Sequence, residues 1–200
     1  MARNPLSTEI VIDKAAEIAD SEGLDALSLT RVANDLSISQ PALYRYVDGF
    51  DDLVRALGLR GRQVLADRLG SSAVGLSGDD AIRAMGYAWR STVRDHSGLY
   101  AATDRYACAG DAELEAAVDR IVSILGKGLA SYSLSTDNTV HAGRALRSAF
   151  HGFSHLEAGD GYPMGQDLDE SFDGLLTLLC RGVQALAADG SLEPAAAGLP

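Results

Sequence analysis

Apolar residues recur at three- and four-residue steps along almost the whole chain, which is the spacing of helices that bury one face. In the first such segment, Ser7–Glu22, the apolar positions form one stripe, and Gly23 follows as a stop signal. We find no stretch with the apolar/polar alternation that is typical of a strand ladder. The pattern therefore predicts an all-α fold.

Two short helical segments follow the first one. Leu29–Leu36 carries one apolar face and has Ser28 in position to cap its start. After a tight turn, Ser39 can cap a very short helix with Pro41 in its first turn, where the missing N–H of proline costs nothing. This helix is expected to end near Tyr46. Three helices with a tight turn between the last two are typical of a helix-turn-helix head.

The pattern in the remainder of the chain predicts further helices. A fourth helix begins near Asp51 and Asp52, whose negative charges suit a helix N-terminus, and runs to about Leu69. A Ser/Gly-rich stretch from Gly70 to Gly78 follows and is the best candidate for a boundary. Five more helices are predicted, over the ranges Asp79–His96, Leu99–Tyr106, Asp111–Tyr132, Asn138–Leu156 and Asp167–Ala188.

These segments suggest a domain plan. Residues 1–53 form the helix-turn-helix head, 54–69 a connecting helix and 70–190 a helical ligand-binding and dimerisation domain. Residues 191–200, rich in Ala, Gly and Pro, are expected to be a frayed tail.

Composition narrows the class of protein. With 200 residues, of which 46% are hydrophobic and 22% charged, the chain can bury a proper core. No apolar run approaches the length of a membrane span, and the first residues lack the apolar core of a signal peptide, so we expect a cytoplasmic protein without a membrane partner. Cys108 and Cys180 lack metal or disulfide spacing and are expected to be reduced thiols.

Charge does not favour a nucleic-acid partner. The formal net charge is −11, and acidic residues also outnumber basic ones in the first 65 residues. Any affinity for DNA must come from a local patch, and it should depend only shallowly on salt because few phosphates would be neutralised.

Despite this charge, the sequence of residues 10–53 resembles that of the TetR family of bacterial transcriptional regulators. The resemblance rests on Leu-Ser at 27–28, Val-Ala-x-x-Leu at 32–36, Pro-Ala-Leu-Tyr-x-Tyr-Val at 41–47 and Asp-Asp-Leu at 51–53. It implies a homodimeric repressor that binds a double-stranded DNA operator and is released by a small-molecule effector, with no cofactor and no enzymatic activity.

Within the head, apolar positions are expected to lock the helices together, and the polar or aromatic remainder to meet the major groove. The predicted DNA-binding residues are Thr30, Arg31, Ser39, Gln40, Pro41, Tyr44, Arg45 and Tyr46. Gln40 can pair with adenine, and the Pro41 ring can lie against a thymine methyl. Arg31 and Arg45 suit guanine or phosphate, whereas Thr30 and the Tyr44 hydroxyl suit the DNA backbone; by resemblance, Tyr44 is a phosphate contact. Alternatively, Tyr44 and Tyr46 simply pack between helices.

Two positions depart from the family pattern. Ser37 stands where the family usually has a glycine, so it must accept a left-handed backbone or turn differently. Phe50 stands where the family usually has a lysine that grips a phosphate. One anchor to the DNA backbone is therefore in doubt.

The C-terminal half is expected to hold the dimer surface and the effector site. By resemblance, the last two helices of each protomer form a four-helix bundle. The segment 144–157 also looks like part of a WHG-type C-terminal domain. Arg147 replaces the Trp of that motif, and the His-Gly pair is present as His151 and Gly152. An effector site needs an apolar cavity with a few polar groups. The candidate ligand-binding residues are Trp89, His96, Tyr100, Phe150 and His151.

Two other kinds of function compete with this prediction. His151 and His155 stand at metal-ligand spacing with Glu157 nearby, but a third ligand on that face and an H-E-x-x-H motif are missing, so no metal site and no catalytic residue is predicted. A helical small-molecule-binding or oligomerisation protein with weak or lost DNA binding is the stronger alternative. A gel shift with DNA flanking its own gene separates it from a regulator.

Overall fold

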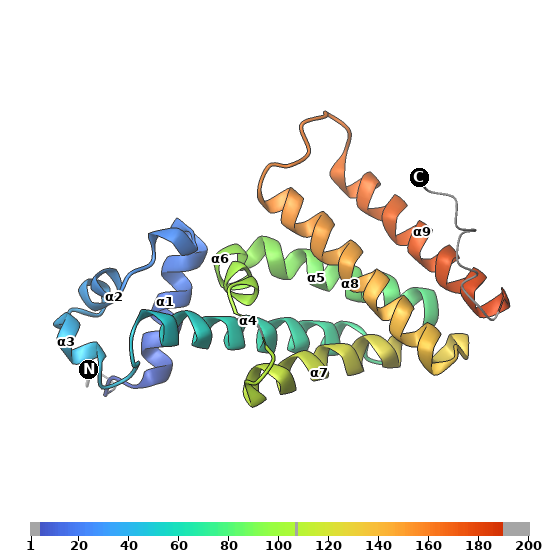
Figure 1. The fold of residues 1–200 in the computed structure, drawn as a ribbon. Coiled ribbons are helices and arrows are strands. Elements are labelled where there is room, and N and C mark those ends of the chain that lie inside the picture. Colours follow the sequence, from blue (N-terminus) through green and yellow to red (C-terminus); the bar gives the residue numbers. More distant parts are fainter. Residues whose placement is uncertain (1–4, 107, 190–200) are drawn as a thin grey trace, which may run out of the picture. The chain divides into compact units, whose positions relative to one another are not determined.

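Helices joined by turns and loops make up the part of the chain that the computed structural model describes, residues 5–106 and 108–189 (Figure 1). The expectation of an all-α fold is confirmed. The α-helices of these residues are α1 Thr8–Glu22, α2 Leu29–Leu36, α3 Gln40–Leu43, α4 Phe50–Ser72, α5 Gly78–Asp95, α6 Ser97–Ala101, α7 Ala112–Gly128, α8 Thr136–Ala158 and α9 Leu168–Asp189. Short 3-10 turns occupy Leu24–Ala26, Ala102–Asp104 and Ala130–Tyr132. The predicted tail, 191–200, lies outside the described residues.

Local capping explains where the first helices begin and end. The hydroxyl of Ser7 accepts a hydrogen bond from the Ile10 amide (3.3 Å), and that of Ser28 accepts one from the Arg31 amide (3.1 Å), as predicted for Ser28. Gly23 ends α1 with φ 88°, a backbone angle that glycine adopts without strain. Ser39 stands at the N-cap position of α3, but its side chain makes no capping bond, so that part of the prediction was wrong.

Several predicted boundaries also differ from the structure. α3 ends at Leu43 and not near Tyr46, and the following residues form a turn. α4 continues to Ser72 and shortens the expected linker. The predicted helix 99–106 is α6 followed by a 3-10 turn. The predicted helix 111–132 ends as an α-helix at Gly128, and a 3-10 turn replaces its last part, in keeping with the weak helix propensity of glycine.

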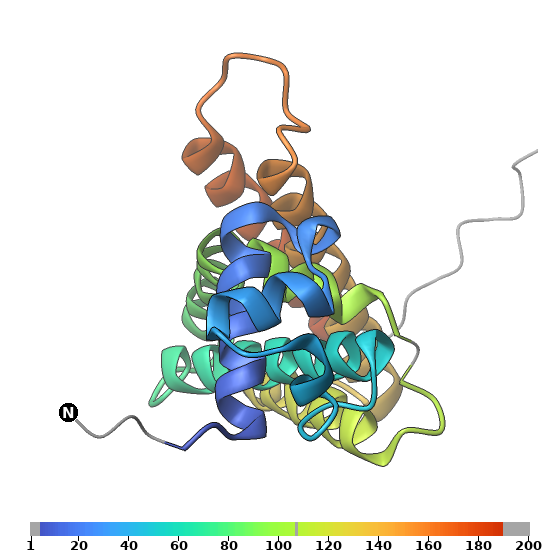
Figure 2. The ribbon, with the colours of Figure 1, turned by 90° about the vertical axis from the view of Figure 1, so that its left-hand side faces the viewer.

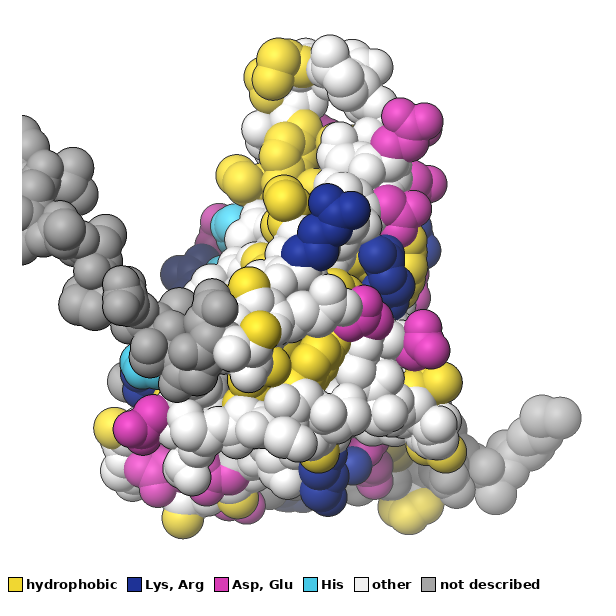
Figure 3. Space-filling model, turned by 90° about the vertical axis from the view of Figure 1, so that its right-hand side faces the viewer, with side chains coloured by type: hydrophobic (Ala, Val, Ile, Leu, Met, Phe, Trp, Pro, Cys, Tyr) yellow, Lys and Arg dark blue, Asp and Glu magenta, His cyan; other side chains and the backbone are white. Residues whose placement is uncertain are grey.

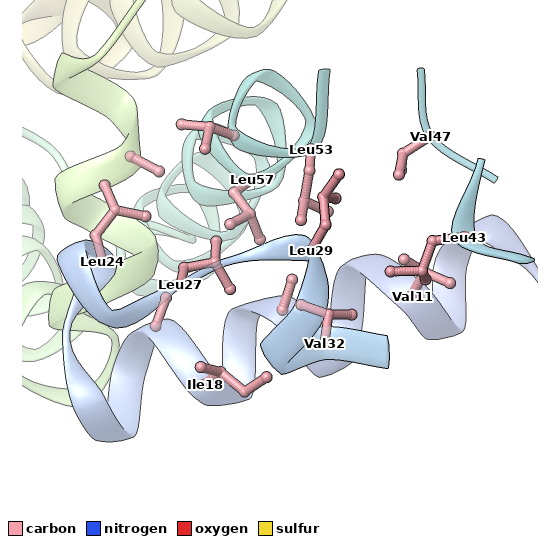
Figure 4. Packing of buried hydrophobic residues seen from close by; sticks show 14 of the residues in the cluster. Val11, Ile18, Leu24, Leu27, Leu29, Val32, Leu43, Val47, Leu53 and Leu57 are labelled. Carbon is pink, nitrogen blue, oxygen red and sulfur yellow. The ribbon is translucent and has the colours of Figure 1, made fainter. Parts of the chain in front are cut away.

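Contacts within the chain divide it into two compact units. The first comprises the described part of Met1–Leu65 with Thr92–Asp119, and the second comprises Ala66–Ser91 with the described part of Arg120–Pro200. In the first unit, α1, α2, α3 and the start of α4 share one apolar core, in which Val11, Val32 and Leu43 are fully buried (Figure 4). The short helix α6 packs on α1 in the same unit.

The core of the second unit lies between α5, α8 and α9. Leu146, Phe150, Phe172 and Leu176 are fully buried there. α5 approaches closely at Gly86, where a Cβ atom would meet a methyl of Leu176 at 2.5 Å. α8 and α9 pack side by side (Figure 1). Among the described helices, none is both long and apolar enough to cross a membrane.

Candidate nucleic-acid interface and ligand-contacting residues

Buried apolar side chains hold α2 and α3 in place on the core of the first unit. Leu29, Val32 and Ala33 of α2 and Leu43 of α3 are buried in the core of the first unit (Figure 4). Because α3 has a single turn, its orientation depends on this packing rather than on its own helical stability. The outward face of α3 is thereby held in one position.

The turn between these helices uses a residue that was singled out from the sequence. Ser37 adopts the left-handed conformation, with φ 57° and ψ 42°, and its amide bonds to the carbonyl of Asn34 at 3.0 Å. Serine therefore takes the strained backbone that glycine would adopt freely, instead of turning differently.

Most of the predicted DNA-binding side chains lie on the surface. In Figure 2, α2 and α3 face the viewer. The exposed members of the predicted set are Thr30, Ser39, Gln40, Pro41, Tyr44 and Arg45. Tyr44 is 53% exposed, against the alternative that it packs between helices. Tyr46 is half-buried against the core of the first unit, in accord with that alternative.

Two of these exposed side chains bind each other. The Thr30 hydroxyl donates a hydrogen bond to the Oε1 atom of Gln40, at 2.9 Å. A carbonyl oxygen has two lone pairs, so the amide of Gln40 keeps one acceptor site and both N–H donors for another partner. The contact therefore orients the amide without exhausting it.

The two predicted arginines differ in their surroundings. The Arg31 guanidinium contacts the carboxylates of both Glu22, at 2.6 Å, and Asp35. These hydrogen bonds raise the pKa of Arg31, with the bond to Glu22 contributing most. The Arg45 guanidinium, in contrast, makes no hydrogen bond or ion pair with the residues that the structure describes, and only the backbone amide of Arg45 is bonded, to the Ala42 carbonyl.

Phe50 is the first residue of α4, and 41% of it is exposed. A large apolar side chain therefore stands in solvent where the family resemblance places a lysine. The following acidic residues act as expected at a helix start, since the Asp52 carboxylate accepts a hydrogen bond from the Asp48 amide (3.0 Å).

The five predicted ligand-binding residues separate into two groups. Trp89 and Phe150 are buried in the second unit, with ring centroids 6.0 Å apart. His151, on the same helix as Phe150, is half-buried and stacks on His155 at 5.6 Å. His96 and Tyr100 belong to the first unit.

In the first unit, His96 takes part in a contact between α6 and α1. Its Nδ1 atom lies 2.8 Å from the Asp20 carboxylate, which also accepts a hydrogen bond from the Leu99 amide at 2.8 Å. This contact was not foreseen, because Asp20 and His96 are far apart in the sequence and neither stands in a motif.

A second network that sequence reasoning missed surrounds Arg90. Its side chain is only 7% exposed and lies over the rings of Phe153 and Phe172, at 5.5 and 5.0 Å from their centroids. The guanidinium donates to Glu157 at 2.6 and 2.7 Å and to Asp169 at 2.7 Å, and these bonds raise its pKa. Arg90 thus links α5 to α8 and α9. The sequence did not predict this network, because its members are far apart in the chain and belong to no motif.

Several side chains of α8 and α9 face solvent. Apolar Val140, Leu156 and Leu178 are 46%, 47% and 68% exposed. Gly143 and Gly174 leave open space where a Cβ atom would stand. On the face that Figure 3 draws, hydrophobic side chains lie along the middle, with basic and acidic side chains beside them.

Comparison with known proteins agrees with this architecture. Residues 82–179 match the family model described as Tetracyclin repressor-like, C-terminal domain. The chain is 30% identical to the uncharacterized HTH-type transcriptional regulator YobS of Bacillus subtilis, over 83% of this chain and 86% of that protein. It is 32% identical to the uncharacterized HTH-type transcriptional regulator Rv0681 of Mycobacterium tuberculosis, over 92% of this chain and 85% of that protein.

Solved structures share the fold. One is the Streptomyces coelicolor TetR family protein ActR in complex with (S)-DNPA. Its TM-score is 0.65 at 20% identity, over 92% of this chain and 99% of that one.

Proposed function

The chain belongs to the TetR family of transcriptional regulators, and we propose that it is a homodimeric repressor that a small molecule releases from its DNA operator. The observation that carries the DNA-binding part is the exposed outer surface of α3 and its C-cap residue Tyr44. Leu43 is buried in the core and holds α3 in place, whereas Gln40, Pro41 and Tyr44 are exposed to solvent. A face of this kind fits the major groove of duplex DNA.

In this proposal the exposed side chains have separate roles. Gln40 reads a base edge, because its amide can pair with adenine, and the Pro41 ring contacts a thymine methyl. Thr30 holds the Gln40 amide in one orientation through their hydrogen bond. Tyr44 and Arg45 bind the DNA backbone, which sets the register of the head but carries no sequence information.

Dimerisation is assigned to α8 and α9. A single head reads only a short half-site, so two heads must be joined to reach useful specificity, with their recognition helices about 34 Å apart. The exposed apolar side chains Val140 and Leu178 and the open positions at Gly143 and Gly174 suit close packing of helices from two protomers.

The effector is assigned to the second unit, near Trp89, Phe150 and His151. Support comes from the match of 82–179 to a tetracyclin repressor-like domain and from the ligand-bound neighbour ActR. If effector and operator are coupled, each changes the affinity of the other by the same factor, on the order of 5- to 150-fold.

The test of DNA binding is selection of bound fragments from sheared genomic DNA by the purified protein, followed by gel shifts on the selected duplex. Gln40→Ala should weaken binding to that duplex by about 1 to 3 kcal/mol and leave random DNA almost unaffected. Thr30→Val keeps the shape of the side chain but removes the hydroxyl, and it should lower discrimination in the same direction. Failure to enrich any fragment would favour the alternative, a helical binding protein without an operator.

A further inference from the structure

Arg31 lies at the end of α2 that carries the predicted DNA contacts, but two carboxylates occupy its guanidinium. Glu22 binds Nε at 3.4 Å and Nη2 at 2.6 Å, and Asp35 binds Nη1. The three side chains are 36%, 40% and 32% exposed for Arg31, Glu22 and Asp35. They are therefore accessible from solvent, and we name this group the Arg31 cluster.

Both acids stand at helix ends where their charge is unfavourable for the helix dipole. Glu22 is the last residue of α1, and Asp35 is the penultimate residue of α2. The C-terminal end of a helix carries partial negative charge, so an acidic side chain is unfavourable there. No basic residue stands in the last turn of either helix to offset it. What both carboxylates have in common is their contact with Arg31.

The Arg31 cluster combines one positive with two negative charges. To an approaching phosphate it is therefore a weakly repulsive group rather than a cation. Exposed ion pairs of this kind add little to stability, so their main effect is on the charge that the surface presents. Arg45 is then the cation on α2, α3 and the turn after them that is not matched by a carboxylate within the described residues.

We propose that Glu22 and Asp35 set the DNA affinity of this head by neutralising Arg31, so that the protein binds duplex DNA with one phosphate contact fewer than its arginines would allow. This inference rests on the proposed DNA binding. It concerns the sequence-independent part of the affinity, because phosphate contacts act alike on every sequence.

The test compares three proteins on two duplexes, the fragment selected by the wild type and a random duplex of the same length. The variant Glu22→Gln/Asp35→Asn removes both carboxylate charges but keeps side-chain size. The matched control Asp119→Asn/Asp137→Asn removes two exposed acidic charges from α7 and α8. The third protein adds Arg31→Gln to the first variant. Fluorescence anisotropy over a potassium chloride series gives affinity and its salt slope, and thermal melting checks that all variants fold.

The proposal predicts that Glu22→Gln/Asp35→Asn binds both duplexes about five- to tenfold more tightly at low salt than the control does. The slope of log K against log salt should steepen by about 0.9, the value for one added phosphate contact. Adding Arg31→Gln should cancel both changes.

The proposal is overturned if the variant behaves like the control, or if its gain survives Arg31→Gln. A gain confined to the selected duplex would also overturn it, since Arg31 would then read bases. The proposed function fails separately, if the wild type binds the selected and the random duplex equally. In that case a gain on random DNA that requires Arg31 would still support the inference.

Discussion

Replacing Gly98 by alanine should disrupt the contact between α6 and α1. A Cβ atom at Gly98 would lie 1.8 Å from the carbonyl oxygen of Ala19 and 2.7 Å from the amide nitrogen of Asp20. These are backbone atoms of α1, so no side-chain rotation can relieve the overlap. α6 must move away from α1, and the Leu99 amide then loses its hydrogen bond to the Asp20 carboxylate, which is 2.8 Å long in the native contact.

The magnitude follows from two costs. Forcing an extra methyl into a packed site costs about 1 to 3 kcal/mol. Losing a hydrogen bond to a charged group adds roughly 1.5 to 3 kcal/mol. The free energy of unfolding should therefore fall by about 2.5 to 6 kcal/mol, which for a chain of this size lowers the melting temperature by at least about 5 °C.

Gly126→Ala is the matched control. Gly126 lies inside α7, and a Cβ atom there has no heavy atom within 4 Å. Because alanine favours a helix over glycine by about 0.8 to 1.0 kcal/mol, the same chemical change should raise the melting temperature by a few degrees. The two variants should thus shift stability in opposite directions.

The assay is thermal unfolding followed by circular dichroism at one fixed protein concentration, since the melting temperature of a dimer depends on concentration. Hydrogen exchange at the Leu99 amide supplies a local readout, because its protection should be lost in Gly98→Ala and kept in Gly126→Ala. The reasoning is refuted if Gly98→Ala melts within about 2 °C of the wild type, a shift far below that expected for several kcal/mol.

Three further changes test other parts of the structure. Ser37→Gly should raise the urea midpoint, since it relieves a left-handed serine at φ 57° and so stabilises the head by about 1 kcal/mol; an unchanged midpoint would contradict the strained turn. Phe50→Lys should tighten binding to any duplex and steepen the salt slope by about 0.9 in anisotropy titrations, and no change would show that Phe50 is remote from phosphate. Hydrogen bonds from Arg55 lower the pKa of Asp111 from its ordinary value to about 2. The ion pair therefore stabilises the fold fully at pH values above the ordinary carboxyl pKa. This stabilisation is lost as the pH falls from the ordinary carboxyl pKa towards 2. An acid titration of unfolding should show this loss in the wild type, whereas Asp111→Asn should lack it.

Helix positions were predictable because they depend on local signals. The apolar stripe of α1, the Ser28 cap and the acidic start of α4 are each encoded within a few neighbouring residues, and the structure contains all of them. Helix ends were less predictable, because several weak terms compete there. The end of α7 at Gly128 and the extension of α4 to Ser72 are examples.

Contacts between distant residues could not be derived in the same way. The bonds of Arg90 to Glu157 and Asp169 and the close approach of Gly98 to Ala19 depend on tertiary packing, which a single sequence does not reveal. For the same reason, the sequence did not show that His96 and Trp89 belong to different compact units. The exposed face of α3 was easier, since Leu43 is the large apolar residue of this single turn and is buried, whereas Gln40 and Pro41 are exposed.

The charges around α2 and α3 determine what kind of DNA binding this head can support. Glu22 and Asp35 offset Arg31, Phe50 supplies no charge, and Arg45 remains as an unmatched cation among the described residues of this surface. Electrostatic attraction to phosphate is therefore weak, and little sequence-independent affinity is available. Under the proposed function, discrimination then depends on groups that meet base edges, foremost Gln40, whose amide Thr30 orients. A regulator built in this way should show a shallow salt dependence together with a large loss of operator binding when the Gln40 amide is removed, a combination that a strongly basic head would not give.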